Sequence, residues 1–129
     1  VDTTAVGDPA GLVSTVNRTE FPTSDLEKAK AAMDKTGFAY RTGLVATGDW
    51  FATDTPRAHW ISDTFHPLLC DMEGGADAQV CLRNGVPFMS IKSVSDCLFV
   101  QDDFFFNFPT AMKDLNRVAM AFIDALEAL

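Results

Sequence analysis

Acidic residues stand where predicted strands of this chain end, and Asp96 closes the most strand-like stretch. Residues Pro87–Asp96 are mostly apolar and β-prone, and they open with proline at a position where a strand tolerates one. In an open parallel sheet, ligands bind in the crevice beyond the carboxyl ends of the strands. Asp96 is therefore a candidate for acid–base chemistry as well as for capping a turn.

Two further acids occupy comparable places. Asp49 follows the predicted strand Thr42–Thr47, and Glu73 follows the predicted strand Leu68–Met72. The carboxyl ends of parallel strands meet at one edge of a sheet. We therefore expect these acids to line one acidic pocket.

Each of these residues also has an ordinary structural interpretation. Asp96 can cap a turn, Glu73 can be a first-turn acid stabilised by the helix dipole, and Asp49 suits a common Gly-Asp turn. Phe51 and Phe106 can be ordinary apolar contacts. Composition and periodicity alone indicate an α/β domain with an acidic pocket and do not choose between these interpretations.

The sequence offers no metal or cofactor motif. His59 and His66 have no third ligand at metal-binding spacing. A G-x-S-x-G elbow, a P-loop and a G-x-G-x-x-G loop are also absent from the sequence. We expect neither a metal nor a cofactor.

Alternating strand and helix patterns predict an α/β fold with a mostly parallel sheet and flanking helices. Local signals set the helix ends: Ser24 has capping-box spacing to Glu27, and Pro56 suits a first helical turn. Gly74 and Gly75 cost helix propensity in a first turn, which indicates that something packs against that helix start. The expected strands are Val1–Val6, Thr42–Thr47, Leu68–Met72 and Pro87–Asp96, and the expected helices run from Ser24 to Gly37, Pro56 to Phe65, Glu73 to Arg83 and Pro109 to Leu129.

Composition limits the classes of partner that this chain is expected to bind. The 129 residues carry a net charge of −8, which argues against a nucleic-acid partner because such binding depends on Lys and Arg at phosphates. No run approaches the ~20 apolar residues of a membrane helix. Three cysteines without a C-x-x-C pair favour reduced thiols, and hence a cytoplasmic location. We expect a small-molecule ligand.

Three segments together resemble the C-terminal half of the nucleoside phosphorylase/hydrolase family. They are Gly43–Phe51 (GLVATGDWF), Asp71–Cys81 (DMEGGADAQVC) and Val86–Asp96 (VPFMSIKSVSD), in this order and at suitable spacing. The set is most similar to the branch of 5′-methylthioadenosine/S-adenosylhomocysteine nucleosidases. The resemblance covers nearly all of this chain but about half of the family's domain.

The resemblance implies roles for four residues around the bond that breaks. Asp96 would be the general acid that protonates purine N7, because an adenine anion is a poor leaving group. Ser95 would orient that carboxyl. Glu73 would accept hydrogen bonds from the ribose 2′- and 3′-hydroxyls, with Met72 packed on the sugar. Glu73 and Asp96 should then converge on one cavity that holds a ribose with its purine.

The resemblance also implies contacts around the base and the 5′-substituent. Phe51 would stack on adenine, and the backbone of Ala52 would read the base edge. Phe106 would belong to the apolar wall around the 5′-substituent. The segment near Val1–Pro9 is similar to the family's dimer-interface stretch, so a homodimer of the completed domain is expected.

By this resemblance, residues 1–129 are the C-terminal part of a single domain whose N-terminal half, with the glutamate that activates water, lies on another segment or chain. The expected activity is hydrolysis of adenine nucleosides, within methionine salvage, and the chain alone should be inactive. Two alternatives stay open: a phosphorylase that attacks with phosphate, and a nucleoside-binding or storage-type relative without turnover.

Overall fold

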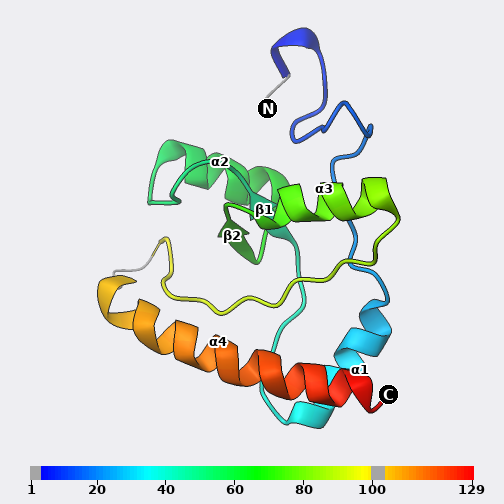
Figure 1. Cartoon of the computed structure of the whole chain (residues 1–129). Helices are drawn as coiled ribbons and strands as arrows, with labels where there is room; N and C mark the ends of the chain where they lie inside the picture. The colour runs from blue at the N-terminus through cyan, green and yellow to red at the C-terminus, as the bar shows by residue number, and fades with distance from the viewer. Residues whose placement is uncertain (1–3, 100–103) are drawn as a thin grey trace.

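The structure is a computed structural model that describes residues 4–99 and 104–129, the side chains of residues 104–106 excepted. It forms two layers, with α1 and α4 packed together on one side and the strands with α2 and α3 on the other (Figure 1). The elements in chain order are a 3₁₀ turn at Thr4–Val6, α1 at Leu26–Thr36, β1 at Val45–Thr47, α2 at Pro56–Phe65, β2 at Leu69–Asp71, α3 at Gly74–Asn84 and α4 at Phe104–Glu127.

The strands form a parallel pair connected through α2, which is a β-α-β unit. Val45 pairs with Leu69, and Thr47 at the end of β1 pairs with Asp71 at the end of β2. The chain leaves β2 and enters α3 after two residues, and α3 packs against β1. The predicted α/β class with parallel strands is therefore confirmed, and the end of the strand pair faces the start of α3.

The sheet is smaller than predicted. Residues Thr4–Val6 form a 3₁₀ turn instead of a strand, and residues 1–3 lie outside the described part. The described residues of Pro87–Asp96 form no strand, and the sheet has two strands among the described residues. A β-prone sequence becomes a strand only when a neighbouring strand takes up its backbone hydrogen bonds.

Three helices have one end at or within one residue of the predicted position. Thr55 caps α2 by accepting a hydrogen bond from the Ala58 amide, and Pro56 stands in the first turn. Helices α1 and α3 end at Gly37 and Gly85, both in the left-handed conformation that glycine tolerates.

The starts of α1 and α4 differ from the prediction. Asp25, not Ser24, caps α1, with its Oδ1 accepting from the Lys28 amide at 3.3 Å. Helix α4 begins five residues before Pro109, which lies inside it. A proline there removes one hydrogen bond to the preceding turn.

The hydrophobic core lies between α1 and α4. Phe122 of α4 packs with Ala29, Ala32 and Met33 of α1. Met89 and Ile91 of the irregular segment pack against this cluster, together with Phe38, Tyr40, Val118, Ala125 and Leu126. The core thus fixes the segment that leads to Asp96 against the long helix.

Candidate active site

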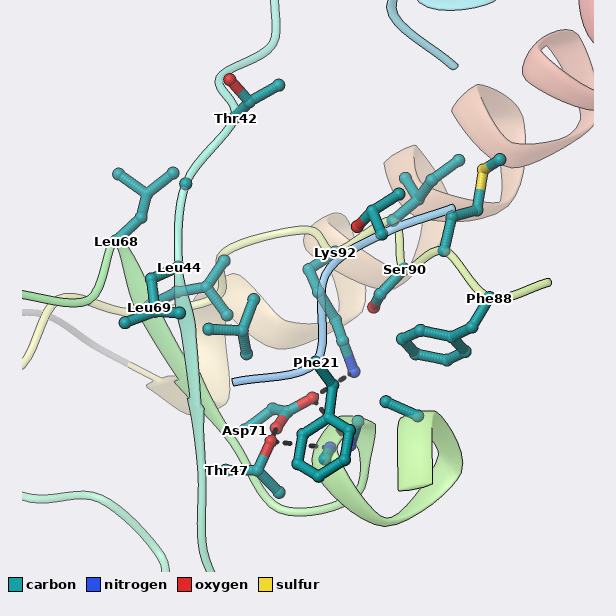
Figure 2. Close-up of a pocket in the computed structure, with 18 of the residues that line it drawn as sticks. Phe21, Thr42, Leu44, Thr47, Leu68, Leu69, Asp71, Phe88, Ser90 and Lys92 are labelled. Carbon is teal, nitrogen blue, oxygen red and sulfur yellow. Dashed lines mark hydrogen bonds and ion pairs between the residues drawn. The ribbon is translucent and has the colours of Figure 1, made fainter. Parts of the chain in front are cut away.

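A hydrogen-bonded network joins the ends of β1 and β2 to the start of α3. Asp71 Oδ1 accepts a hydrogen bond from Thr47 Oγ1 at 2.6 Å, and Asp71 Oδ2 accepts from the Gly74 amide at 3.0 Å. Thr47 Oγ1 in turn accepts from the Gly75 amide at 2.8 Å. Lys92, reaching across from the segment after α3, places its ammonium 2.6 Å from Asp71 Oδ2 (Figure 2).

Glycine at the start of α3 allows this close approach. A Cβ on Gly74 would lie 2.5 Å from Asp71 Oδ2, and one on Gly75 would lie 2.9 Å from the Thr47 Cβ. Atoms this close must move apart. The prediction that something packs against this helix start is confirmed, and the neighbours are the side chains of Asp71 and Thr47.

Asp71 is held in its charged form. Burial by itself raises the pKa of this carboxyl, but the hydrogen bonds from Lys92 and Thr47 and the charge of Lys92 outweigh burial and leave the pKa below its ordinary value. The Asp71 side chain is 9% exposed and the Lys92 side chain 30% exposed. The pair is therefore shielded from water more than a surface ion pair is.

Glu73 occupies the N-cap position of α3, but its side chain caps nothing. Asp71 and Thr47 satisfy the first amides of the helix instead. In the described part of the chain, the exposed Glu73 carboxylate has neither a hydrogen-bond nor an ion-pair partner. Its two oxygens are available to accept hydrogen bonds from a ligand.

Asp96 ends the irregular segment and is half-buried. Ser95 Oγ donates a hydrogen bond to Asp96 Oδ1 at 2.7 Å. This is the contact expected of a residue that orients the carboxyl, while the roles of both residues stay predictions. Asp96 lines a cavity of about 320 Å³ together with Ser93, Val94, Ser95, Cys97, Asn107, Thr110, Ala111 and Asp114.

A larger cavity of about 1220 Å³ lies beside the Asp71 network. Its wall includes Thr47 and Asp71 at the strand ends and Lys92 (Figure 2). Met72 also lines it. The two cavities share Ser93, Val94 and Asp114 as lining residues, so they are neighbours. Glu73 lines neither of them, although Met72 and Gly74 on either side of it line the larger one. The structure does not bring Glu73 and Asp96 to one cavity.

The other predicted site residues are dispersed. Asp49 and Met72 line the larger cavity. Phe51 is 59% exposed and Ala52 half-buried, and neither lines either of the two cavities. The backbone of Phe106 belongs to α4, and its side chain lies outside the described part.

Sequence reasoning missed the three side chains that build the network: Thr47, Asp71 and Lys92. Thr47 and Asp71 were placed inside predicted strands, where they looked like ordinary strand residues. The available signal was their position as the last residues of two neighbouring parallel strands, just before a helix that opens with two glycines. Lys92 had no such signal, because its partner lies 21 positions away in the sequence and meets it only in the fold.

The described residues contain neither a metal-binding cluster nor a membrane-spanning helix. In residues 4–99 and 104–129, no group of three or more His, Cys, Asp or Glu side chains is arranged to hold a metal ion. Within the same residues, no helix has the length and apolar character needed to cross a membrane.

Known proteins resemble this chain in sequence. The profile of the Phosphorylase superfamily matches residues 2–124. A 5′-methylthioadenosine/S-adenosylhomocysteine nucleosidase from Geobacillus kaustophilus is 38% identical over 94 residues, which are 71% of this chain and 39% of that protein. A protein of the same name from Shewanella frigidimarina is 38% identical over 99 residues, covering 74% of this chain and 43% of its own length.

Solved structures resemble it in fold. A futalosine hydrolase mutant from Helicobacter pylori superposes with a TM-score of 0.78 at 25% identity, covering 96% of this chain and 54% of the other. A candidate 5′-methylthioadenosine/S-adenosylhomocysteine nucleosidase from Borrelia burgdorferi, bound to adenine, superposes with a TM-score of 0.79 at 27% identity. This match covers 99% of this chain and 55% of the other. The chain thus spans about two-fifths of the curated relatives and about half of the solved ones. Because the superfamily profile matches almost from end to end, the chain belongs to the phosphorylase superfamily.

Proposed function

We propose that this chain is the C-terminal part of a nucleoside N-ribosyl hydrolase domain that is completed by a separate N-terminal segment or chain. The proposal is supported by relatives that carry nucleosidase and hydrolase names. The single observation that carries it concerns the carboxylate of Glu73 at the start of α3: it has no partner among the described residues, while Asp71 and Thr47 do the capping.

The reaction assigns one task to each carboxylate. Asp96 gives a proton to purine N7, and the bond between N9 and C1′ then breaks so that the base leaves neutral. Positive charge develops on the sugar carbon, and Glu73 accepts hydrogen bonds from the 2′- and 3′-hydroxyls near that charge. Water adds to C1′ and loses its proton to a base on the completing polypeptide. In the proposal, the completing polypeptide also closes the space between the neighbouring cavities.

Adenine nucleosides of the 5′-methylthioadenosine type are the proposed substrates, with Phe51 and Ala52 at the base, Met72 at the sugar and Phe106 at the 5′-substituent. The relatives' names and the adenine in the Borrelia burgdorferi structure support this choice. We further propose a cytoplasmic enzyme of methionine salvage that works as a homodimer of completed domains, with neither a nucleic acid nor a membrane as partner.

The test begins with the native protein. Its intact mass shows whether a second polypeptide accompanies these 129 residues. The complete protein should then release adenine from 5′-methylthioadenosine without phosphate, while the 129-residue chain alone should release none. A strict need for phosphate would assign a phosphorylase instead of a hydrolase.

Asp96→Asn in the complete protein separates catalysis from binding. General acid catalysis contributes ~10²–10⁴-fold, so we expect a loss of about that size in kcat with nucleoside binding retained. Asp114→Asn is the matched control, because Asp114 lines the same small cavity but has no proposed catalytic role. If wild type and Asp96→Asn release the base equally slowly, a binding role without turnover replaces the enzyme.

A further inference from the structure

The first turn of α2 makes aromatic contacts with two segments that lie far apart in the sequence. The imidazole of His59 stacks on the Phe99 ring, with the ring centroids 4.5 Å apart and an interplanar angle of 22°. The guanidinium carbon of Arg57 lies 5.0 Å from the centroid of the Trp50 ring. Both distances are typical of attractive contacts, the first of a stacked aromatic pair and the second of a cation–π pair. One helix start thus holds both segments.

Ala58 explains why the two contacts point to different places. Successive residues of an α-helix lie ~100° apart around its axis, and Ala58, between Arg57 and His59, is 3% exposed. The side chain of Ala58 therefore faces the body of the protein, and its two neighbours leave the helix in different directions. Thr55 Oγ1 accepts a hydrogen bond from the Ala58 amide at 3.3 Å, which fixes this turn. The start of α2 is thus a fixed point for both contacts.

The contact with Phe99 gives the segment around Asp96 a second attachment. Before Asp96, Lys92 pairs with Asp71, and after Asp96, Phe99 stacks on His59. Phe99 follows Asp96 by three residues, and three residues of extended chain span at most ~11 Å. The stack therefore limits how far the proposed general acid can move.

This attachment is close to the surface and depends on the orientation of the imidazole. The His59 side chain is 58% exposed, and Phe99 is 49% exposed. His59 Nε2 lies 2.8 Å from Asp54 Oδ1, and this hydrogen bond fixes the plane of the ring that Phe99 covers. In the part of the chain that the structure describes, the backbone of residues 97–99 bonds no other backbone group. Side-chain contacts such as this stack therefore hold the segment.

The contact with Trp50 holds the loop that continues into Phe51 and Ala52. A Cβ on Gly48 would lie 2.9 Å from Trp50 Cδ1, so the indole packs directly on the residue that follows β1. The Trp50 amide also donates to the Gly48 carbonyl at 2.8 Å. With Arg57 at the same ring, the indole is held both by the end of β1 and by α2. The loop thus begins from a fixed position.

We propose that Phe99 and Trp50 are positioning residues, through which the first turn of α2 fixes the proposed general acid and the proposed adenine-binding loop relative to each other. Phe99 acts through the segment of Asp96, and Trp50 acts through Phe51 and Ala52. The inference rests on the proposed function, which gives the acid and the loop their roles. The two contacts predict different kinetic effects, because one positions the proton donor and the other positions the surface that binds the base.

Phe99→Leu in the complete protein tests the contact with His59. Leucine keeps an apolar side chain but removes the ring face, so kcat for adenine release from 5′-methylthioadenosine should fall roughly fivefold or more, while KM stays within about twofold. Phe99→Tyr keeps the ring and should stay within about twofold of wild type in both constants. His59→Leu should reproduce the loss. The double variant should lose no more than either single variant, because both remove the same contact.

Trp50→Leu tests the contact with Arg57. Loss of a fixed base-binding loop weakens ground-state and transition-state binding alike, so KM should rise roughly fivefold or more while kcat stays within about twofold. Arg57→Met should change KM in the same direction. Trp60→Leu is the matched control, because Trp60 is a 48% exposed tryptophan of the same helix whose ring contacts Phe65 within α2. It should leave both constants unchanged.

Nitrogen-15 relaxation tests the same contacts in the 129-residue chain without an activity assay. A rigid backbone has an order parameter S² of ~0.85, and a flexible one falls below ~0.6. The amides of Cys97 and Leu98 should pass from the rigid to the flexible range in Phe99→Leu, and the amide of Ala52 should do so in Trp50→Leu. Each variant should leave the amides of the other segment in the rigid range.

The outcomes separate the positioning role from the enzyme. Unchanged order parameters in both leucine variants, losses that fall on the same kinetic constant in both, or equal losses in Trp60→Leu would overturn the positioning proposal. If the complete wild-type protein releases no adenine, the proposed hydrolase is wrong, and the order parameters alone then decide whether α2 holds the two segments.

Discussion

The ammonium of Lys92 lies 2.6 Å from Asp71 Oδ2, and this contact joins the segment leading to Asp96 to the strand end that precedes Glu73. One ion pair thus joins the segment before Asp96, the proposed general acid, to the strand before Glu73, the proposed ribose-binding residue. An ion pair of this kind depends on both partners, because removing one leaves the other charge shielded and uncompensated.

Lys92→Met should destabilise the chain. Methionine keeps much of the length of the side chain but leaves the Asp71 carboxylate without its cation, so we expect the free energy of unfolding to fall by about 1–3 kcal/mol. Urea unfolding followed by circular dichroism measures it. Lys113→Met is the control, because Lys113 is exposed on α4 and has no partner among the described residues. Equal losses in both variants would mean that the ion pair contributes nothing specific.

Asp71→Asn should change how stability depends on pH. The folded chain holds the pKa of Asp71 below its ordinary value. The contribution of Asp71 to the free energy of unfolding is therefore complete above the unfolded pKa of ~3.9, and it is lost as the pH falls through the lower folded pKa. The stability difference between wild type and Asp71→Asn should be constant from about pH 7 to pH 5 and shrink below about pH 4. A difference that grows on acidification would contradict the depressed pKa.

Gly75→Ala should destabilise the chain although alanine favours helices. Alanine gains about 1 kcal/mol of helix propensity over glycine, but its Cβ would lie 2.9 Å from the Thr47 Cβ. We expect a net loss of about 1–3 kcal/mol, since overpacking typically costs that much. Val80→Ala, at an exposed position of the same helix, should be nearly neutral. Thermal unfolding of both variants measures the change in stability. A stabilised Gly75→Ala would contradict the close contact between position 75 and Thr47.

Phe122→Ala should open the core between α1 and α4. Phe122 is 4% exposed and packs with Ala29, Ala32 and Met33, and such truncations cost ~3–5 kcal/mol. Met120→Ala, on the exposed side of α4, should cost less than ~1 kcal/mol. Loss of helical signal at lower urea in Phe122→Ala alone is the expected result.

Sequence predicted those parts of the fold whose causes are local. Helix α2 begins where Thr55 and Pro56 indicate, because both signals act within one turn. Ser24 shows the limit: its hydroxyl had the right spacing to cap α1, but it bonds instead to Phe88, which lies 64 positions later. The spacing of neighbouring residues cannot predict a hydrogen-bond partner that lies so far away in the sequence.

In the candidate site, too, sequence predicted the local contacts and missed the long-range ones. The hydrogen bond between Ser95 and Asp96 joins sequence neighbours and was expected. The network of Thr47, Asp71 and Lys92 depends on the register of two strands and on a segment that crosses over them, so single-sequence reasoning missed it. Pro87–Asp96 was predicted as a strand from side-chain preference, but strand pairing is a property of two segments.

The side chains that hold the start of α3 belong to residues 47 and 71, not to residue 73. The start of α3 therefore does not depend on a side-chain hydrogen bond from position 73, so Glu73→Gln should cost little stability. The side chain at this position can thus be varied to test its proposed role while the hydrogen bonds that start the helix stay in place.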